Sequence, residues 1–143
     1  MITKEKSTNE LENEIKQSDS ADDYLAENSE YLLKKSVSDT LNEALYRANL
    51  KVSDIVKKSG LTKSHVYHIF NGKRLPSRDK LIAIAFGFGF SCDETNALLK
   101  KCRAAQLYSK DPRDAVIMFN LSHRKSIIDA NLDLEKQGFE ILK

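Results

Sequence analysis

The spacing of apolar residues along this chain predicts helices. From about residue 36 to the end, leucine, isoleucine, valine and alanine recur three and four positions apart, which places them on one face of an α-helix. The 143 residues include only five glycines and two prolines, which leaves little room for the many turns of a β-sandwich. We therefore expect an all-α fold that consists of one domain with a tail.

Residues that favour helix ends divide the region after residue 36 into seven expected helices. Their expected starts are Ser38, Val52, Thr62, Pro76 with Ser77, Ser91, Asp111 with Pro112, and Ser126. Serine, threonine and aspartate accept hydrogen bonds from the free N–H groups of a first turn, and the spacing of Ser91 and Glu94 is that of a capping box. Gly60 and the pair Gly87 and Gly89 are expected to end helices.

The first 35 residues have a different pattern. Residues 1–20 are polar and acidic with little periodicity, which predicts disorder. From Ala21 onward, apolar positions such as Tyr24 and Leu33 indicate a short helix that is interrupted near Asn28. We therefore expect residues 1–35 to form an acidic, partly disordered tail with a possible short helix.

A repeat of 35 residues occurs in the second half of the chain. When residues 78–101 are aligned with residues 113–136, seven of 24 positions are identical. The identical pairs are Arg78/Arg113, Asp79/Asp114, Ile82/Ile117, Ser91/Ser126, Asn96/Asn131, Leu99/Leu134 and Lys101/Lys136. Both copies consist of a helix, a break and a capped helix. The repeat thus predicts two similar helical hairpins, with the second stacked on the first.

Charge is distributed unevenly along the chain. The formal net charge is +2, but residues 1–35 carry −4 and residues 36–143 carry +6. Most of the positive charge lies between residues 36 and 90, where the net charge is +5. This concentration suits a surface that meets phosphates, although a solvated lysine-rich surface has the same composition.

Composition also limits the cellular location. No apolar run approaches the roughly 20 residues needed to span a bilayer, and the N-terminal residues lack the apolar core of a secretion signal. Cys92 and Cys102 lie ten positions apart in helical sequence, too far along one helix to bridge each other. We therefore interpret them as reduced, buried thiols, which is typical of a cytoplasmic protein. Together with the lack of an apolar run, this predicts a cytoplasmic protein with no membrane contact.

The stretch GLTKSHVYHIFNGKR, residues 60–74, carries the densest hydrogen-bonding chemistry. At about 100° per residue, one arc of this helix contains Lys63, Ser64, Tyr67, His68 and Asn71. Val66, Ile69 and Phe70 lie on the opposite side, where they can enter a core, and His65 lies on the flank. No acidic residue lies anywhere between positions 55 and 78.

A short helix, a turn at Gly60 and this second helix have the layout of a helix-turn-helix, whose second helix enters the major groove of DNA. Base edges need side chains that donate and accept hydrogen bonds. The expected base-reading residues are Lys63, Ser64, His65, Tyr67 and His68. Asn71, Lys73 and Arg74 follow directly and are expected to hold phosphates, which fixes the register without reading sequence.

With these residues, the chain resembles the Cro/C1-repressor (Xre-type) helix-turn-helix family. The resemblance covers roughly residues 37–90, and GLTKSHVYHIFNGKRLPS with its NGKR-x-P-S end is the most specific part. The resemblance implies base reading by Lys63, Ser64, Tyr67 and His68, and a phosphate contact by Asn71. A glutamine common in the family is Val52 here, and we expect Ser53 to supply the phosphate contact instead.

Other site chemistries lack their signatures. The two histidines His65 and His68 and the two cysteines do not form the closely spaced pairs of a structural zinc site, so we expect no metal and no cofactor. No Ser-His-acid set, P-loop or glycine-rich phosphate fingerprint is present. We therefore expect no catalytic residues and no enzymatic activity.

The sequence thus predicts a sequence-specific DNA-binding transcriptional regulator, a repressor or autoregulator, that reads the major groove with the helix 62–70. Residues 36–102 are expected to form a helix-turn-helix domain of about five helices, and residues 103–143 a helical hairpin that extends it. Double-stranded DNA is the expected partner, bound by a homodimer on a palindrome. The alternative is a protein-interaction module, an antitoxin or adaptor, whose residues 111–143 bind another protein while DNA binding is secondary.

Overall fold

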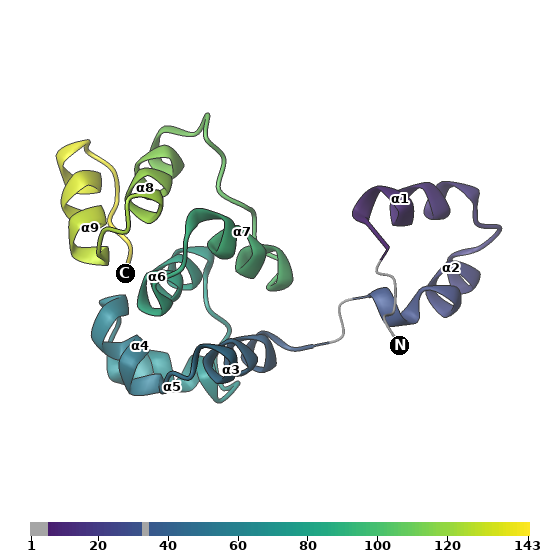
Figure 1. Ribbon diagram of the computed structural model, residues 1–143, viewed down its shortest axis with the longest axis horizontal. Helices are drawn as coiled ribbons and strands as arrows, with labels where there is room; N and C mark the ends of the chain where they lie inside the picture. Colours follow the sequence, from purple (N-terminus) through teal and green to yellow (C-terminus); the bar gives the residue numbers. More distant parts are fainter. Residues whose placement is uncertain (1–5, 33–34) are drawn as a thin grey trace. The chain divides into compact units, whose positions relative to one another are not determined.

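The computed structural model describes residues 6–32 and 35–143, and every regular element in these ranges is helical (Figure 1). The chain divides into two compact units, residues 1–34 and residues 35–143. The all-α expectation is therefore confirmed for the described residues.

The first unit is more ordered than the sequence predicts. It contains α1 (Thr8–Gln17), α2 (Ala21–Glu27) and the 3₁₀ turn η1 (Ser29–Tyr31). The expected disorder over residues 1–20 is therefore wrong for the ten residues of α1, whereas the interruption near Asn28 is confirmed as the end of α2. Residues 1–5 and Leu33 lie outside the described residues.

A partly buried polar contact connects the start of α1 to the end of α2. The Lys6 ammonium donates to the Glu14 carboxylate at 2.6 Å and to the Asn28 side-chain oxygen at 2.8 Å, and Asn28 is fully buried. Ser7 caps α1 by accepting from the Glu10 N–H. Because one contact joins positions 22 residues apart, apolar periodicity could not predict it.

The second unit contains the remaining helices. They are α3 (Val37–Ala48), α4 (Val52–Ser59), α5 (Lys63–Phe70), α6 (Arg78–Phe88), α7 (Cys92–Lys101), α8 (Pro112–Ser122) and α9 (Ile127–Lys136). All seven expected helices are present. Ser36, and not Ser38, caps α3 by accepting from the Asp39 N–H, so this expected start is two residues late.

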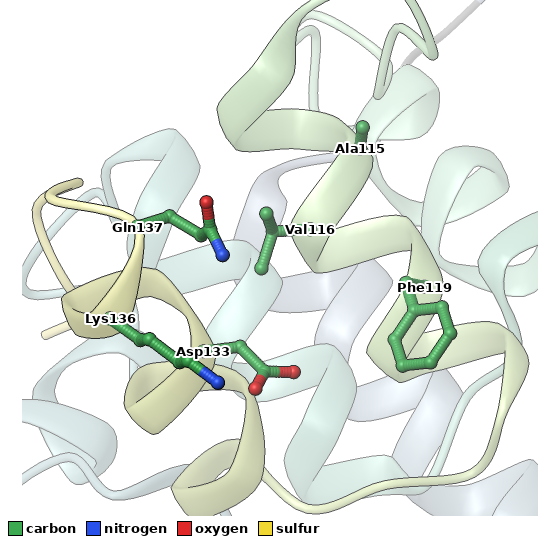
Figure 2. Close-up of a pocket in the computed structure, with 6 residues that line it drawn as sticks. All are labelled: Ala115, Val116, Phe119, Asp133, Lys136 and Gln137. Atoms are coloured by element: carbon green, nitrogen blue, oxygen red, sulfur yellow. The ribbon is translucent and has the colours of Figure 1, made fainter.

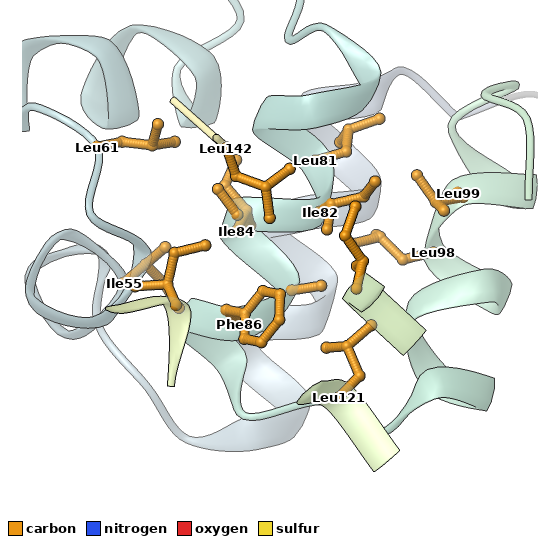
Figure 3. Close-up of a cluster of buried hydrophobic side chains, with 14 of the residues drawn as sticks. Ile55, Leu61, Leu81, Ile82, Ile84, Phe86, Leu98, Leu99, Leu121 and Leu142 are labelled. Atoms are coloured by element: carbon orange, nitrogen blue, oxygen red, sulfur yellow. The ribbon is translucent and has the colours of Figure 1, made fainter. Parts of the chain in front are cut away.

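Helix α6 lies at the centre of the core. Every residue from 81 to 87 is buried, and the side chains around them come from α4, α7, α8 and the chain end (Figure 3). Gly87 lies inside α6 and does not end it, contrary to expectation; Gly89 is the left-handed C-cap. A Cβ atom at position 87 would lie 3.0 Å from the Ile55 Cγ2 and 3.2 Å from the Ile55 carbonyl oxygen, so glycine permits the close approach of α4 to α6.

The C-terminal helices form the second hairpin that the repeat predicts. Helices α6 and α7 make one hairpin and α8 and α9 another, and the two pack together within the second unit. Ile117, Leu121 and Leu134 of the second hairpin are buried in the same hydrophobic core as Ile82 and Leu99 of the first.

Candidate nucleic-acid interface

The two sides of α5 have opposite chemistry. Val66, Ile69 and Phe70 are buried, with at most 4% of each residue exposed. The exposed residues of the helix are Lys63, Ser64, Tyr67 and His68. Burial of one apolar side against α3 and α4 therefore orients the polar side toward solvent.

Hydrogen bonds at both ends fix the position of α5. At its start, Thr62 caps the helix by accepting from the His65 N–H at 3.3 Å. At its end, the Asn42 amide of α3 donates to the Phe70 carbonyl at 2.7 Å and also to the Ser38 carbonyl at 2.8 Å. The bond from Asn42 to Phe70 ties the end of α5 to α3 independently of the apolar contacts.

Glycines make the two turns beside α5. Gly60 ends α4 at φ +72°, in the left-handed region that other residues rarely adopt, and so makes the corner between α4 and α5. Gly72 follows α5 at φ +81°, where a Cβ atom would approach the Ser38 hydroxyl oxygen to 3.2 Å. The layout of helix, glycine corner and second helix is therefore the one that the sequence predicts.

The exposed face of α5 displays donors and acceptors at adjacent positions. The Lys63 ammonium lies 5.8 Å from the centre of the Tyr67 ring, and Tyr67 is 40% exposed. No acidic residue lies between positions 55 and 78, so the segment that contains α5 contributes no negative side chain to this face. Such a face can donate to base edges, accept from them and stand beside phosphates without charge repulsion.

His65 is placed differently from the other expected base readers. Its ring is half-buried, it lies 3.3 Å from the Thr62 hydroxyl through Nδ1, and Arg74 is hydrogen-bonded to its Nε2. Burial lowers the pKa of His65, and the nearby positive charges of Lys80, Arg74 and His68 lower it further. The side chain therefore connects the start of α5 to the loop that follows it.

The expected phosphate-holding residues are all exposed. Asn71 forms the C-cap of α5, and its side-chain oxygen accepts from the Lys73 N–H at 3.0 Å, which shapes the turn. Lys73 and Arg74 follow Asn71 in that turn, after the end of α5. Ser53 is exposed in the first turn of α4, on the other side of the Gly60 corner.

Sequence reasoning missed the residues that support this surface from behind. Asn42 donates to the last residue of α5 although it lies 28 positions before it, and Ser38 lies beside Gly72 in the turn that follows. The only signal for Asn42 is a polar residue between Leu41 and Leu45, which are both buried. An asparagine at such a position is common on exposed helices, so this signal is weak.

The described residues give no support to a metal centre or a membrane span. No group of three or more His, Cys, Asp or Glu side chains among them could hold a metal ion. Burial raises the pKa of both thiols, Cys92 and Cys102, which disfavours the reactive thiolate. Within the same ranges, none of the helices has the length and apolar character that crossing a bilayer requires.

Comparison with known proteins agrees with the geometry of this surface. Residues 44–94, which include all of α4, α5 and α6, match the model of a helix-turn-helix family. The class defined by this fold and surface is that of DNA-binding regulators. The match supports the resemblance to the Cro/C1-type, Xre-like helix-turn-helix family over this part of the chain. No curated protein and no solved structure matches the chain.

Proposed function

We propose that this protein is a sequence-specific transcriptional repressor or autoregulator that reads the major groove with the exposed face of α5. The observation that carries the proposal is this face itself. Its four exposed residues can donate to or accept from base edges, and no acidic residue of the surrounding segment opposes DNA. Repression follows from occupation of a promoter site and needs no catalytic group.

The residues have two proposed roles. Lys63, Ser64, Tyr67 and His68 contact bases, and the Tyr67 ring offers an apolar surface to a thymine methyl group. Ser53, Asn71, Lys73 and Arg74 hold phosphates on either side of the groove. In the free protein the His65 Nε2 accepts a hydrogen bond from Arg74. When DNA binds and His65 takes up a proton, both ring nitrogens become donors, so the ring releases that guanidinium to a phosphate and its accessible edge can donate to a base.

Two copies of the chain on a palindromic operator complete the proposal. One helix of eight residues reads only a few base pairs, whereas a two-fold arrangement doubles the number of base contacts. Half-sites would then be separated by about one turn of DNA, roughly 34–36 Å.

Selection of bound sequences from a random double-stranded DNA pool tests this function. We expect the wild-type chain to enrich a defined motif, because its contacts to base edges differ in energy by about 1–3 kcal/mol per base pair. A matched selection with Tyr67→Ala should enrich a motif that is relaxed at one or two positions. Enrichment of no motif by the wild-type protein would favour the adaptor alternative.

We expect DNA binding to tighten as the pH falls from about 8 to about 6. The pKa of His65 lies below its ordinary value in the free protein, and nearby phosphates favour the charged imidazolium. Since the bound state then takes up a proton, affinity rises as the pH falls through the pKa of the bound state. The rise levels off below the pKa of the free state and is at most about tenfold per pH unit for one proton.

The matched pair His65→Gln and His123→Gln checks this pH dependence by titration of a fixed duplex at several pH values. His65→Gln should flatten the dependence, whereas His123→Gln, at the end of α8, should leave it unchanged. Equal pH dependence in the wild type and His65→Gln would show that His65 does not take up the proton.

The open face of the second hairpin supports the second candidate, a protein-interaction module. A groove of about 370 Å³ between α8 and α9 is lined by Ala115, Val116, Phe119, Asp133, Lys136 and Gln137 (Figure 2). Phe119 is 51% exposed and Leu132 of α9 is 60% exposed. Exposed apolar side chains often mark an interaction surface, so an adaptor would bind its partner at this groove, where Phe119 is part of the lining.

A further inference from the structure

The two helical hairpins make reciprocal ion pairs with each other. The Arg78 guanidinium of α6 donates to the Asp114 carboxylate of α8 at 2.8 and 3.0 Å. The Arg113 guanidinium of α8 donates to the Asp79 carboxylate of α6 at 2.9 and 3.0 Å. Because residues 113 and 114 are the counterparts of 78 and 79 in the 35-residue repeat, exchange of the hairpins turns one pair into the other.

Contacts inside each hairpin repeat with the same offset. The Arg78 Nε donates to the Ala105 carbonyl at 2.8 Å, and the Arg113 Nε donates to the Glu140 carbonyl at 3.1 Å. The side-chain oxygen of Asn96 accepts from the Leu107 N–H, and that of Asn131 accepts from the Leu142 N–H, both at 2.8 Å. The two hairpins thus share internal geometry as well as sequence.

Backbone conformation follows the same offset. Residues at the equivalent positions Gly89 and Arg124 have φ values of +74° and +57°, and Arg103 and Gly138 have +60° and +80°. Arginine rarely adopts this left-handed region, so its presence opposite a glycine in each pair indicates that the hairpin shape determines the conformation. The hairpins are therefore structural copies.

Apolar side chains accompany the reciprocal ion pairs. Ile82 and Phe86 of α6 are buried together with their counterparts Ile117 and Leu121 of α8. Asp114 is also buried, which alone would raise its pKa, but hydrogen bonds from Arg78 and the Tyr108 N–H outweigh burial and hold the pKa below its ordinary value. The ion pairs are thus charged parts of a packed interface.

In a two-fold homodimer, residue i of the first copy contacts residue j of the second, and residue j of the first contacts residue i of the second. The two ion pairs between the hairpins have this symmetry. In this chain the two sides belong to one polypeptide. The first hairpin presents Arg78 and Asp79 next to each other, so a second copy of that hairpin could satisfy both charges, with each arginine facing the other copy's aspartate. The second hairpin, α8–α9, has the arrangement that such a copy would have.

We propose that the α6–α7 hairpin carries a self-complementary docking surface for a second copy of this chain, and that α8–α9 occupies this surface within the same chain. The surface is centred on Arg78, Asp79, Ile82 and Phe86. A second copy binds there when α8–α9 is displaced, and two recognition helices are then brought into one assembly. The DNA-binding consequence rests on the proposed function, whereas the docking surface itself does not.

Because α8–α9 belongs to the same chain as α6–α7, it should occupy the docking surface in preference to a second copy. A tethered segment has an effective concentration in the millimolar range, whereas a second copy is present at micromolar concentration. The wild-type chain should therefore be monomeric at this surface in dilute solution. Any change that weakens only the α8 side should shift the balance toward pairing of two copies.

Charge reversal on either side of the contact tests the proposal with the full chain. Arg113→Asp/Asp114→Arg places like charges opposite α6 but leaves the α6 surface intact, so sedimentation equilibrium at about 10–100 µM should show a dimer. Arg78→Asp/Asp79→Arg should also dimerise, because the reversed charges remain complementary between two copies. The quadruple variant restores complementarity within the chain and should be monomeric, like the wild type.

A milder pair of variants covers the case in which a charge-reversal variant does not fold. Arg113→Gln removes one ion pair within the chain and none between two copies, so self-association should tighten on the order of tenfold relative to wild type. Arg78→Gln removes one pair within the chain but both pairs between copies, so it should not tighten. A merely structural role for the two arginines would make these variants behave alike.

Three outcomes would overturn the proposal. They are monomeric, folded double-reversal variants; a quadruple variant that still dimerises; and equal self-association of Arg113→Gln and Arg78→Gln. All of these measurements are made without DNA. Their failure is therefore distinguishable from failure of the proposed function, which selection from a DNA pool tests independently.

Discussion

Gly87→Val is expected to lower the free energy of unfolding of the second unit by about 3 kcal/mol, at the upper end of the usual cost of overpacking. The Cβ atom that any substitution adds here would lie 3.2 Å from the Ile55 backbone carbonyl oxygen, which cannot move away as a flexible side chain could. Two further methyl groups must push α4 away from α6. Thermal unfolding followed by circular dichroism should show a midpoint lower by on the order of 10 °C.

The same substitution should also weaken DNA binding at temperatures where the protein is folded. Displacement of α4 moves the Gly60 corner, and α5 follows from that corner. Ala97→Val on the exposed side of α7 is the matched control, because it adds the same methyl groups at a site with free space and should cost about 0.5 kcal/mol or less. Equal midpoints for the two variants would contradict the close packing of α4 on α6.

Lys73→Ala/Arg74→Ala should produce the largest loss of DNA affinity. If both cations neutralise phosphates, the slope of log affinity against log salt concentration should become less steep by about two. Binding at low salt should weaken to a similar extent for a selected duplex and a scrambled duplex, since phosphate contacts carry no sequence information. Fluorescence anisotropy titrations between about 50 and 200 mM salt provide the measurement.

Lys110→Ala, in the loop between the hairpins, is the control for this double variant. It removes an exposed cation far from α5 in sequence and should leave the slope unchanged. Arg74 also contacts His65, so Lys73→Ala alone separates the loss of a phosphate contact from the release of that histidine. A wild-type affinity that does not respond to salt would remove the electrostatic part of the proposal.

Most of the helix positions could be predicted because they depend on local chemistry. The Ser91 and Glu94 capping box and the helix start at Asp111–Pro112 each depend on four or fewer consecutive residues, and both are confirmed. Position 87 could not be predicted in this way. A glycine within an apolar stretch is compatible with a helix end or with a close helix crossing, and only the approach of Ile55 distinguishes these possibilities.

In the candidate site, too, the features set by local sequence could be predicted and those set by distant contacts could not. The polar face of α5 could be predicted from helical spacing, because the buried and exposed sides alternate within eight residues. The bond between His65 and Arg74 could not, since it depends on the path of the loop after Gly72. Likewise, the 35-residue repeat predicts two stacked hairpins, but the reciprocal ion pairs between Arg78, Asp79 and their counterparts become visible only when the hairpins face each other.

The measurement that tests sequence-specific reading by α5 most directly is the ratio of affinities for a selected duplex and a scrambled duplex of equal length. We expect the wild-type ratio to be about a thousandfold or more at physiological salt. Tyr67→Ala and His68→Ala should each reduce the ratio by a factor that corresponds to about 1–3 kcal/mol, with the scrambled duplex bound as before. A wild-type ratio near one, or variants that weaken both duplexes equally, would contradict base reading by this helix.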